Sequence, residues 1–577
     1  MKSSMKAGLL VGIFTAGSLL LIPAAQAAAS DQGACEALAA KVTNLNGTSV
    51  RLTSSVFVTD GATIQAQMGP GATIPVPVPA HCDITGALHE RTGENGQAYA
   101  IRFHMRLPVK WNQRFVFQGG GGSNGDIGDA LGMGTGAVPA LAQGYAVVSQ
   151  DSGHDNATNT DPMHNGQVAF GFDPISRADY GHTSLKVVAD TAKDILKVYY
   201  GRKPLYSYFI GCSKGGQEGM TFATLYPEEF DGILASAPGF ALPRAAVAEA
   251  WDVQSFGALA KAPGSDTVSF MALNGTYSDA DLSLVRTAIL AACDKDDGLA
   301  DGIVGDYLGC TDAKVIPKLQ AIACAAGKTD ACLSSAQIKA LVVSHTGPVN
   351  STGRALYAGW FWPTGIAGND WRLWKIGSAD GHIPALNVIL GGPSLASVFT
   401  TPPTVLGPSP QAIVDYQMRF DMDRDAAGIY AVAAPFTTSA WHDVGSHSTD
   451  LSAFRKRGGK LMVPHGDSDP VFSLKDTLGW YDEVNTRNGG KAAAFARIFP
   501  VPGMCHCGGG QATNQYDAFN ALVSWVEKHQ APDSLLGTAT PASPWPGRQR
   551  PICAYPLVAR YNGSGDIEKA SSFTCKA

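Results

Sequence analysis

A serine in a glycine-rich turn constrains the fold of this chain more than any other feature. Ser213 is the third residue of the motif GCSKGG (residues 211–216), which directly follows the apolar run 208–210. A strand, a G-x-S-x-G turn and a helix in this order form a nucleophile elbow, which raises a serine hydroxyl above the edge of a sheet. The pattern therefore predicts a strand and a helix on either side of an exposed serine hydroxyl.

A histidine beside a second cysteine supplies another part of the predicted site. His506 is followed directly by Cys507, and Ser213 is preceded directly by Cys212. A serine hydroxyl is a poor nucleophile near neutral pH, so it needs a base that accepts its proton. We predict that His506 is this base and that a Cys212–Cys507 disulfide holds it beside Ser213.

The acid that orients the base is expected between the serine and the histidine. Triads of α/β-hydrolases follow the chain order Ser, then Asp or Glu, then His. The segment HGDSDP (residues 465–470) follows a predicted strand and contains two aspartates. Asp469 is the predicted acid, and Asp467 is the alternative.

A run of glycines supplies candidate donors for the oxyanion that forms during acyl transfer. The loop GGGGSNG (residues 119–125) follows the predicted strand 114–118. Because glycine lacks a Cβ, its backbone amide can lie close to a substrate. We assign the oxyanion hole to the backbone amides of Gly122 and Lys214, and a flexible surface loop is the alternative interpretation of the glycines.

Strands that alternate with helices predict an α/β-hydrolase fold with a mostly parallel sheet. The regular pattern stops near Phe240 and resumes after Ala434. We therefore assign residues 28–240 and 435–577 to a catalytic domain, and residues 241–434 to a lid domain inserted over the active site. Strands are expected at 114–118, 145–149, 208–210, 232–236, 460–464 and 495–499, and helices at 185–199, 215–225 and 516–528.

The start of the chain has the pattern of a secretory signal peptide. Lys2 and Lys6 precede the apolar stretch 7–22, and the motif AQA (residues 25–27) resembles a cleavage site. We expect residues 1–27 to be removed from a secreted or periplasmic protein. The net charge of -6 argues against a nucleic-acid partner and against electrostatic binding to membranes.

Cysteines in an exported chain predict disulfides, because compartments outside the cytoplasm are oxidising. The chain has eleven cysteines, and sequence alone does not fix their pairing. Cys505 is the candidate for the unpaired one. Proximity along the chain favours Cys293–Cys310, Cys324–Cys332 and Cys553–Cys575, with Cys35–Cys82 as the pair that then remains.

An aspartate-rich loop is the second clear signal for a ligand. The segment CDKDDGLADGI (residues 293–303) places carboxylates at short spacing between glycines, which suits a hard cation bound through oxygen. The pattern lacks the final glutamate of an EF-hand, and a solvated acidic turn is the alternative. The predicted ligands of a structural Ca²⁺ ion are the side chains of Asp294, Asp297 and Asp301 and the carbonyl groups of Leu299 and Ile303.

Together these motifs resemble the tannase and feruloyl esterase family of α/β-hydrolases, from about Cys35 to Cys575. The resemblance implies a Ser-Asp-His triad with a cysteine bridge, a lid with one calcium ion, and esters of aromatic acids as substrates. The matching segments are GCSKGG (211–216), the aspartate-rich loop, LSAF (451–454), GGK (458–460), VPGMCHC (501–507), RPICAYP (550–556) and GSGD (563–566).

Within this family the chain is similar to the mono(2-hydroxyethyl) terephthalate hydrolases, through VAFGFDP (168–174) and GPVNS (347–351). The residue after the nucleophile is often acidic in the family, and here it is Lys214. In the terephthalate subgroup a lid arginine holds the free carboxylate of the substrate. This chain has Tyr416 at that place, with Arg419 three residues further on.

Two phenylalanines are predicted to hold an aromatic acyl group. Phe420 lies in the predicted lid, and Phe472 follows Asp469 by three residues. Stacking on both faces of a ring would add about 0.5–1.5 kcal/mol beyond burial. Packing of both rings in the core is the alternative.

The sequence thus predicts a secreted serine esterase that cleaves feruloyl or galloyl esters, without a nucleic-acid or membrane partner. Hydrolysis of mono(2-hydroxyethyl) terephthalate is the alternative activity. A metal-dependent phosphoesterase with His465, Asp467 and Asp469 as ligands is a remote alternative, as is a binding protein on a hydrolase fold.

Overall fold

The computed structural model describes residue 1 and residues 31–69, 72–134, 138–261, 264 and 267–577. Apart from Met1, the predicted signal peptide (residues 1–27) lies outside the described residues, so it stays a prediction. Among the described residues, no helix has both the length and the apolar character that a membrane span needs.

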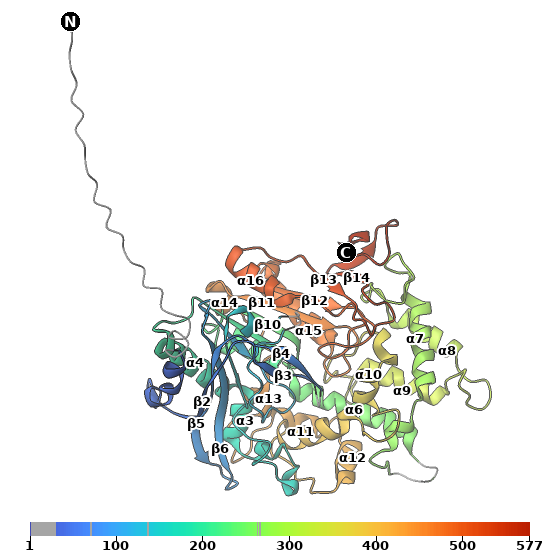
Figure 1. Cartoon of the computed structure of the whole chain (residues 1–577). Helices are drawn as coiled ribbons and strands as arrows, with labels where there is room; N and C mark the ends of the chain where they lie inside the picture. Colours follow the sequence, from blue (N-terminus) through green and yellow to red (C-terminus); the bar gives the residue numbers. More distant parts are fainter. Residues whose placement is uncertain (2–30, 70–71, 135–137, 262–263, 265–266) are drawn as a thin grey trace.

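A ten-stranded sheet forms the centre of the molecule (Figure 1). Neighbouring strands from β8 to β12 run parallel, whereas those from β1 to β8 run antiparallel. In spatial order the strands are β1 (Asn44–Leu45), β2 (Thr48–Val58), β5 (His81–Thr92), β6 (Ala98–Pro108), β8 (Ala146–Gln150), β7 (Arg114–Gln118), β9 (Tyr206–Ser213), β10 (Gly232–Pro238), β11 (Lys460–Gly466) and β12 (Ala496–Val501).

The parallel half of the sheet agrees with the prediction from sequence, and the antiparallel half was not predicted. Each predicted strand overlaps an observed one, from β7 at Arg114–Gln118 to β12 at Ala496–Val501. In contrast, β2 has a single fully buried residue, Val50, among its eleven. A strand with so little buried surface lacks the apolar pattern from which strands are predicted.

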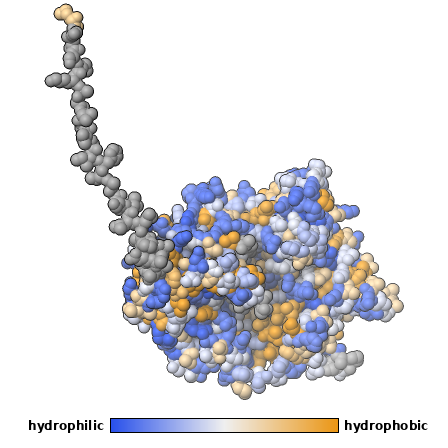
Figure 2. Space-filling view, viewed as in Figure 1, coloured by the Kyte–Doolittle hydropathy of each residue, from blue (hydrophilic) through white to orange (hydrophobic). Residues whose placement is uncertain are grey.

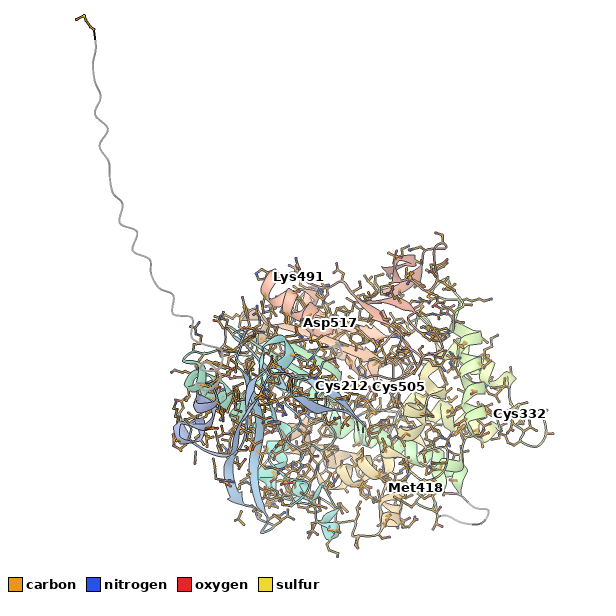
Figure 3. The ribbon with its side chains drawn as sticks, in the orientation of Figure 1. Cys212, Cys332, Met418, Lys491, Cys505 and Asp517 are labelled. Carbon is orange, nitrogen blue, oxygen red and sulfur yellow. A yellow bond between two sulfur atoms is a disulfide. The ribbon has the colours of Figure 1, made fainter. Side chains whose placement is uncertain are left out.

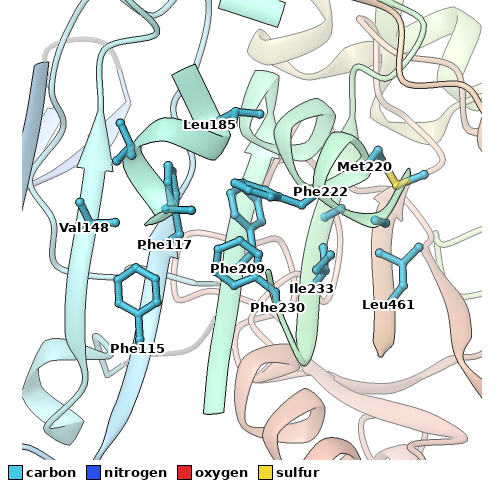
Figure 4. Close-up of a cluster of buried hydrophobic side chains, with 14 of the residues drawn as sticks. Phe115, Phe117, Val148, Leu185, Phe209, Met220, Phe222, Phe230, Ile233 and Leu461 are labelled. Carbon is cyan, nitrogen blue, oxygen red and sulfur yellow. The ribbon is translucent and has the colours of Figure 1, made fainter. Parts of the chain in front are cut away.

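Side chains of the parallel strands alternate between two hydrophobic cores, one on each face of the sheet, as successive residues of a strand must. Phe117, Phe209 and Ile233 point to one face, where helices cover them (Figure 4). Their neighbours Tyr208 and Leu234 point to the other face.

Helices cover both faces of the parallel sheet. Residues of α4 (Ser184–Tyr200), α5 (Lys214–Leu225) and α15 (Leu474–Arg487) enter the first core. Residues of α16 (Ala518–Lys528) enter the second. Smaller elements are the helices α2 (Leu38–Lys41), α3 (Pro174–Ala178) and α14 (Ser452–Lys456) and the hairpins β3 (Thr63–Gly69)–β4 (Ala72–Pro77), β13 (Ser534–Thr538)–β14 (Gln549–Cys553) and β15 (Val558–Tyr561)–β16 (Phe573–Lys576).

The segment between β10 and β11 contributes helices, and its described residues add no strand to the central sheet. In Figure 1 these helices lie beside the sheet, in colours from green through yellow to orange. The action of residues 241–434 as a lid stays a prediction. The α-helices in this range are α6 (Leu242–Ala260), α7 (Asp279–Cys293), α8 (Asp312–Ala321), α9 (Ser335–Thr346), α10 (Asn369–Lys375), α11 (Gly392–Ser397) and α12 (Pro410–Arg419), and α13 (Ala440–Val444) and α14 follow it before β11.

A buried arginine links this segment to the sheet-forming part of the chain. The side chain of Arg177, in α3, is fully buried, and its Nε donates a hydrogen bond of 2.8 Å to Oδ2 of Asp443. The same guanidinium donates to Oγ1 of Thr401 and to the carbonyl oxygen of Thr438. It also lies 3.8 Å from the ring centroid of Phe436.

Replacing Arg177 with methionine is therefore expected to destabilise the protein strongly. The change removes the arginine from the buried carboxylate of Asp443, and breaking a buried ion pair in this way costs about 3–5 kcal/mol. Arg424→Met is the matched control, because Arg424 pairs with Asp425 while its own side chain is 73% exposed, and exposed pairs contribute little. Urea denaturation measures both free energies of unfolding, and equal values for the two variants would contradict this account.

Candidate active site

Ser213 ends β9, and α5 begins at the next residue, as the elbow motif predicted. Its backbone has φ 65° and ψ -120°, a conformation that is rare outside glycine and is typical of a strained nucleophile turn. Neighbouring chain segments approach this turn closely. A Cβ on Gly216 would lie 2.5 Å from the carbonyl oxygen of Ser236, so the turn admits no side chain there.

Ser213, His506 and Asp469 form a continuous chain of hydrogen bonds. Nδ1 of His506 lies 2.8 Å from Oδ2 of Asp469, and Nε2 lies 2.8 Å from Oγ of Ser213. A carboxylate only accepts hydrogen bonds, so Nδ1 of His506 carries the proton. Nε2 is then free to accept the proton of the serine hydroxyl, as a general base must.

The surroundings of Asp469 keep it ionised. Burial alone would raise its pKa, but the charges of and hydrogen bonds from His506 and His465 hold the pKa well below its usual range. The other carboxylate oxygen accepts hydrogen bonds from the amides of Val471 and Phe472, at 2.8 and 3.0 Å. Asp469 is thus fixed in orientation and stays an acceptor.

Asp467, the alternative acid, faces a different part of the protein. Its Oδ1 accepts hydrogen bonds from the amide of Gly503 and from Oγ of Ser468, at 2.7 and 2.8 Å. Burial raises its pKa to about 7. The structure therefore brings Asp469, and not Asp467, to the imidazole of His506.

A second histidine supports the acid, which the sequence did not indicate in this role. Nε2 of His465 lies 3.1 Å from the carbonyl oxygen of Phe472 and 3.3 Å from Oδ2 of Asp469, and Nδ1 lies 3.0 Å from Oγ1 of Thr477. These contacts occupy both ring nitrogens with protein partners. They leave the remote prediction of His465 as a metal ligand without support.

A disulfide joins the residues next to the nucleophile and the base, as predicted. Cys212 and Cys507 are 295 residues apart in sequence, and their Cα atoms are 6.0 Å apart. In Figure 3, Cys212 lies near the centre of the molecule. The bridge holds the chain segment of His506 directly against the elbow.

The remaining cysteines also pair as predicted. The structure contains the disulfides Cys35–Cys82, Cys293–Cys310, Cys324–Cys332 and Cys553–Cys575. Cys505 is free and buried, and burial raises the pKa of its thiol well above the usual value.

The glycine-rich loop lies against the elbow. This arrangement brings both residues with predicted oxyanion-hole amides close to Ser213. Gly122 and Lys214 both line a cavity next to Ser213. The buried carboxylate of Glu218 joins loop and helix, because it accepts hydrogen bonds from the amide of Gly120 at 3.0 Å and from Nζ of Lys214 at 3.0 Å. The cationic side chain of Lys214 is therefore balanced by a buried carboxylate one helical turn later.

The cavity beside Ser213 has a volume of about 400 Å³ and a mostly apolar lining. Its walls include Leu242 and Phe472, and the ring of Phe472 lies 5.3 Å from that of His506. Trp374 also lines it, with its ring 5.7 Å from that of His506, although the sequence did not single it out. Figure 2 shows apolar residues gathered on this side of the molecule, over the region of α11 and α12.

Three of the predicted substrate contacts lie outside the cavity. Tyr416, Arg419 and Phe420 are not among the residues that line the cavity. Nε2 of Gln254, in α6, donates hydrogen bonds to the carbonyl oxygens of Gln417 and Phe420, at 2.9 and 2.7 Å. These bonds hold the end of α12 against α6, so Phe420 packs in the core and Phe472 alone of the predicted pair lines the cavity.

The aspartate-rich loop lies outside the residues that line this cavity. Burial is the main cause that raises the pKa of Asp297 to about 7, and the charges of Asp301 and Asp294 add to it, so the three carboxylates lie close together. Arg550 pairs with Asp301. Within the described part of the chain, no group of three or more His, Cys, Asp or Glu side chains has an arrangement that could hold a metal ion.

The calcium ligands Asp294, Asp297, Leu299, Asp301 and Ile303 therefore stay a prediction. Backbone amides donate hydrogen bonds to each carboxylate: Gly302 donates to both oxygens of Asp294, Leu299 to Asp297, and Ile303 to Asp301.

Comparison with known proteins decides the family. The family model described as "Tannase and feruloyl esterase" matches residues 82–576. The chain belongs to the tannase and feruloyl esterase family. As a member of this family, it is a carboxylic ester hydrolase with the α/β-hydrolase fold.

Three similar proteins illustrate the relationship. Mono(2-hydroxyethyl) terephthalate hydrolase of Piscinibacter sakaiensis is 40% identical over 95% of this chain and 92% of its own length. A probable feruloyl esterase of Arthroderma benhamiae is 30% identical over 82% of this chain and 81% of its own. The crystal structure of feruloyl esterase B from Aspergillus oryzae matches 94% of this chain and all of its own, with a TM-score of 0.73 and 23% identity.

Removing the Cys212–Cys507 bridge is expected to lower the turnover number of ester hydrolysis under conditions where the protein is still folded. A displacement of the base by about 1 Å costs on the order of 100-fold in rate. The test compares kcat of Cys212→Ala/Cys507→Ala with that of the wild type, at a temperature where circular dichroism shows both folded. Cys324→Ala/Cys332→Ala is the matched control and should keep wild-type kcat, because that bridge closes a distant loop of 8 residues. Wild-type kcat without the first bridge would rule out its positioning role.

Proposed function

We propose that this esterase cleaves esters of aromatic acids through an acyl-enzyme formed on Ser213. His506 accepts the proton of the Ser213 hydroxyl as its Oγ attacks the acyl carbon, and then returns that proton to the leaving alcohol. The amides of Gly122 and Lys214 stabilise the oxyanion. A water molecule, activated by His506, releases the aromatic acid and restores the serine.

One observation carries the proposal: the hydrogen-bond chain Asp469–His506–Ser213 ends at an apolar cavity. The aromatic rings of Phe472 and Trp374 flank His506, where an aromatic acyl group would contact both. Burial of such a ring among apolar side chains supplies the binding energy, and ring-to-ring contacts add about 0.5–1.5 kcal/mol.

Mono(2-hydroxyethyl) terephthalate is the second candidate substrate, because the relative with 40% identity hydrolyses this half-ester according to its name. The half-ester carries a free carboxylate, which needs a cation or several donors when it is buried. Among the described residues that line the cavity, Lys214 has the one cationic side chain, and its Nζ already pairs with Glu218 at 3.0 Å. The cavity therefore favours uncharged feruloyl or galloyl esters over the half-ester.

We also propose that the protein acts outside the cytoplasm. Five disulfides support this proposal, since such bonds persist in oxidising compartments. The signal-peptide pattern of residues 1–27 agrees with it.

Replacing the proposed catalytic groups tests the mechanism. Ser213→Ala should lower kcat on methyl ferulate by about 10⁶-fold, and Asp469→Asn by about 10⁴-fold, because an amide favours the wrong imidazole tautomer. Asp467→Asn is the matched control and should stay within a few-fold of the wild type, since Asp467 does not contact His506. Normal turnover by Ser213→Ala, or an equal loss in the two aspartate variants, would refute the assignment.

A panel of purified esters tests the substrate class. Methyl ferulate and methyl gallate should give a higher kcat/KM than mono(2-hydroxyethyl) terephthalate. The opposite order would favour the second candidate without affecting the mechanism.

We further propose that the aspartate-rich loop binds one structural calcium ion, which would relieve the repulsion between its carboxylates. Calcium at 100 times its Kd should then stabilise the wild type by about 2.7 kcal/mol, whereas Asp297→Asn should lose this effect. Asp296→Asn is the control from the same loop, because Asp296 is no predicted ligand and pairs with Lys314 at 2.8 Å. Calorimetric titration with CaCl₂ and melting curves measure both effects, and an unresponsive wild type would contradict the proposal.

A further inference from the structure

A glutamate that the mechanism does not use lies in the wall of the cavity. Glu249 lines the same cavity as Ser213, and only 8% of its surface is exposed. Among the residues that the structure describes, none forms a hydrogen bond or an ion pair with its carboxyl group. A polar group left unpaired in an apolar cavity is costly unless a ligand satisfies it.

The cation whose charge acts on Glu249 is that of Lys375, and it is paired with another carboxylate. Nζ of Lys375 pairs with Oδ2 of Asp252, and it lies 4.2 Å from the ring centroid of Trp360. Asp252 also accepts hydrogen bonds from Oγ of Ser344 and Nδ2 of Asn387. This buried network satisfies Asp252 and Lys375 together, and it leaves Glu249 out.

The backbone next to Glu249 makes room for its carboxyl group. A Cβ on Gly391 would lie 1.9 Å from Oε2 of Glu249, so any other residue at position 391 would displace the carboxyl. Gly391 also lines the cavity.

Helix α6 sets the distance between this carboxyl and the nucleophile. Leu242, Ala245, Ala246 and Glu249 lie on one face of the helix and all line the cavity. The chain just before α6 touches the elbow, where the amide of Gly239 donates to the carbonyl oxygen of Ser213 at 3.1 Å. With a rise of 1.5 Å per residue, Glu249 lies about 10 Å further along the helix than Leu242, and both residues line the cavity that also contains Ser213.

We propose that Glu249 determines specificity by forming a hydrogen bond with a phenolic hydroxyl on the ring of the acyl group. This inference rests on the proposed function and defines its substrate class as esters of hydroxylated aromatic acids. A phenol both donates and accepts a hydrogen bond, as a neutral carboxyl group does. A ring without a hydroxyl leaves the buried carboxyl unpaired, and such a mismatch discriminates strongly between substrates.

The electrostatics of the site agree with a neutral carboxyl group. Burial raises the pKa of Glu249 to about 8, the charge of Lys375 opposes this shift, and the charge of Asp252 adds to it. The other titratable groups whose charges interact with Glu249 are the phenols of Tyr180 and Tyr357. Burial raises the pKa values of both phenols, so they stay neutral at neutral pH.

The test measures kcat/KM for methyl 4-hydroxycinnamate and for methyl cinnamate, which lacks the hydroxyl. The wild type should prefer the hydroxylated ester. Glu249→Leu should lower kcat/KM for that ester by about tenfold to one-hundredfold, the value of one buried hydrogen bond, and leave methyl cinnamate within a few-fold. Glu249→Gln is the matched control: it keeps a donor and an acceptor and should keep most of the preference.

The outcomes separate this inference from the proposed function. An unchanged ratio between the two esters in Glu249→Leu, with both still hydrolysed, would overturn the role of Glu249 and leave the esterase mechanism intact. If the wild type hydrolyses neither ester, the proposed substrate class itself fails.

A second measurement keeps the inference testable if Glu249→Leu does not fold. The raised pKa means that ionisation of Glu249 destabilises the folded state. Relative to Glu249→Gln, the wild type should therefore lose stability between its ordinary pKa of 4.5 and about pH 8, and no more above that. Saturating 4-hydroxycinnamic acid, the product, should shift this loss to higher pH in the wild type, because its phenol binds the neutral carboxyl group. Parallel stability curves for the two proteins at every pH would overturn the inference.

Discussion

The proposed chemistry depends on the hydrogen bond between Oγ of Ser213 and Nε2 of His506, and several features of the fold maintain it. It joins residues 293 positions apart at a distance of 2.8 Å. Neither side chain has useful chemistry alone, since the hydroxyl needs a base and the base needs a fixed orientation. The elbow, the bridge next to it and the buried carboxylate of Asp469 each remove one way in which this contact could be lost.

Much of this arrangement could be predicted from the sequence. The strand before Ser213 is a continuous apolar run, and the order of Ser213, Asp469 and His506 agrees with the hydrolase pattern. The neighbouring cysteines added an independent constraint on distance. The choice between Asp467 and Asp469 needed the structure, because both follow the same strand and only the direction of each carboxyl group distinguishes them.

The walls of the cavity could not be predicted in the same way. Trp374 and Glu249 reach it through the packing of helices around α6, and no local motif marks them. Phe420 lies in the predicted lid but packs in the core, since the end of α12 is held against α6 by Gln254. The antiparallel strands were missed for a related reason: β2 buries a single residue fully, so it carries little apolar pattern. Features that depend on contact between distant segments are thus hard to predict from local sequence patterns.

The cysteine bridge beside His506 also links the chemistry to the compartment in which the chain matures. In a reducing cytoplasm Cys212 and Cys507 stay thiols, and hydrogen bonds alone restrain the imidazole. A newly synthesised chain without the bridge would then hydrolyse esters with a low kcat while it is still in the cytoplasm. If the chain is exported, as proposed above, oxidation outside the cytoplasm would close the bridge, and His506 would be fixed beside Ser213 only there.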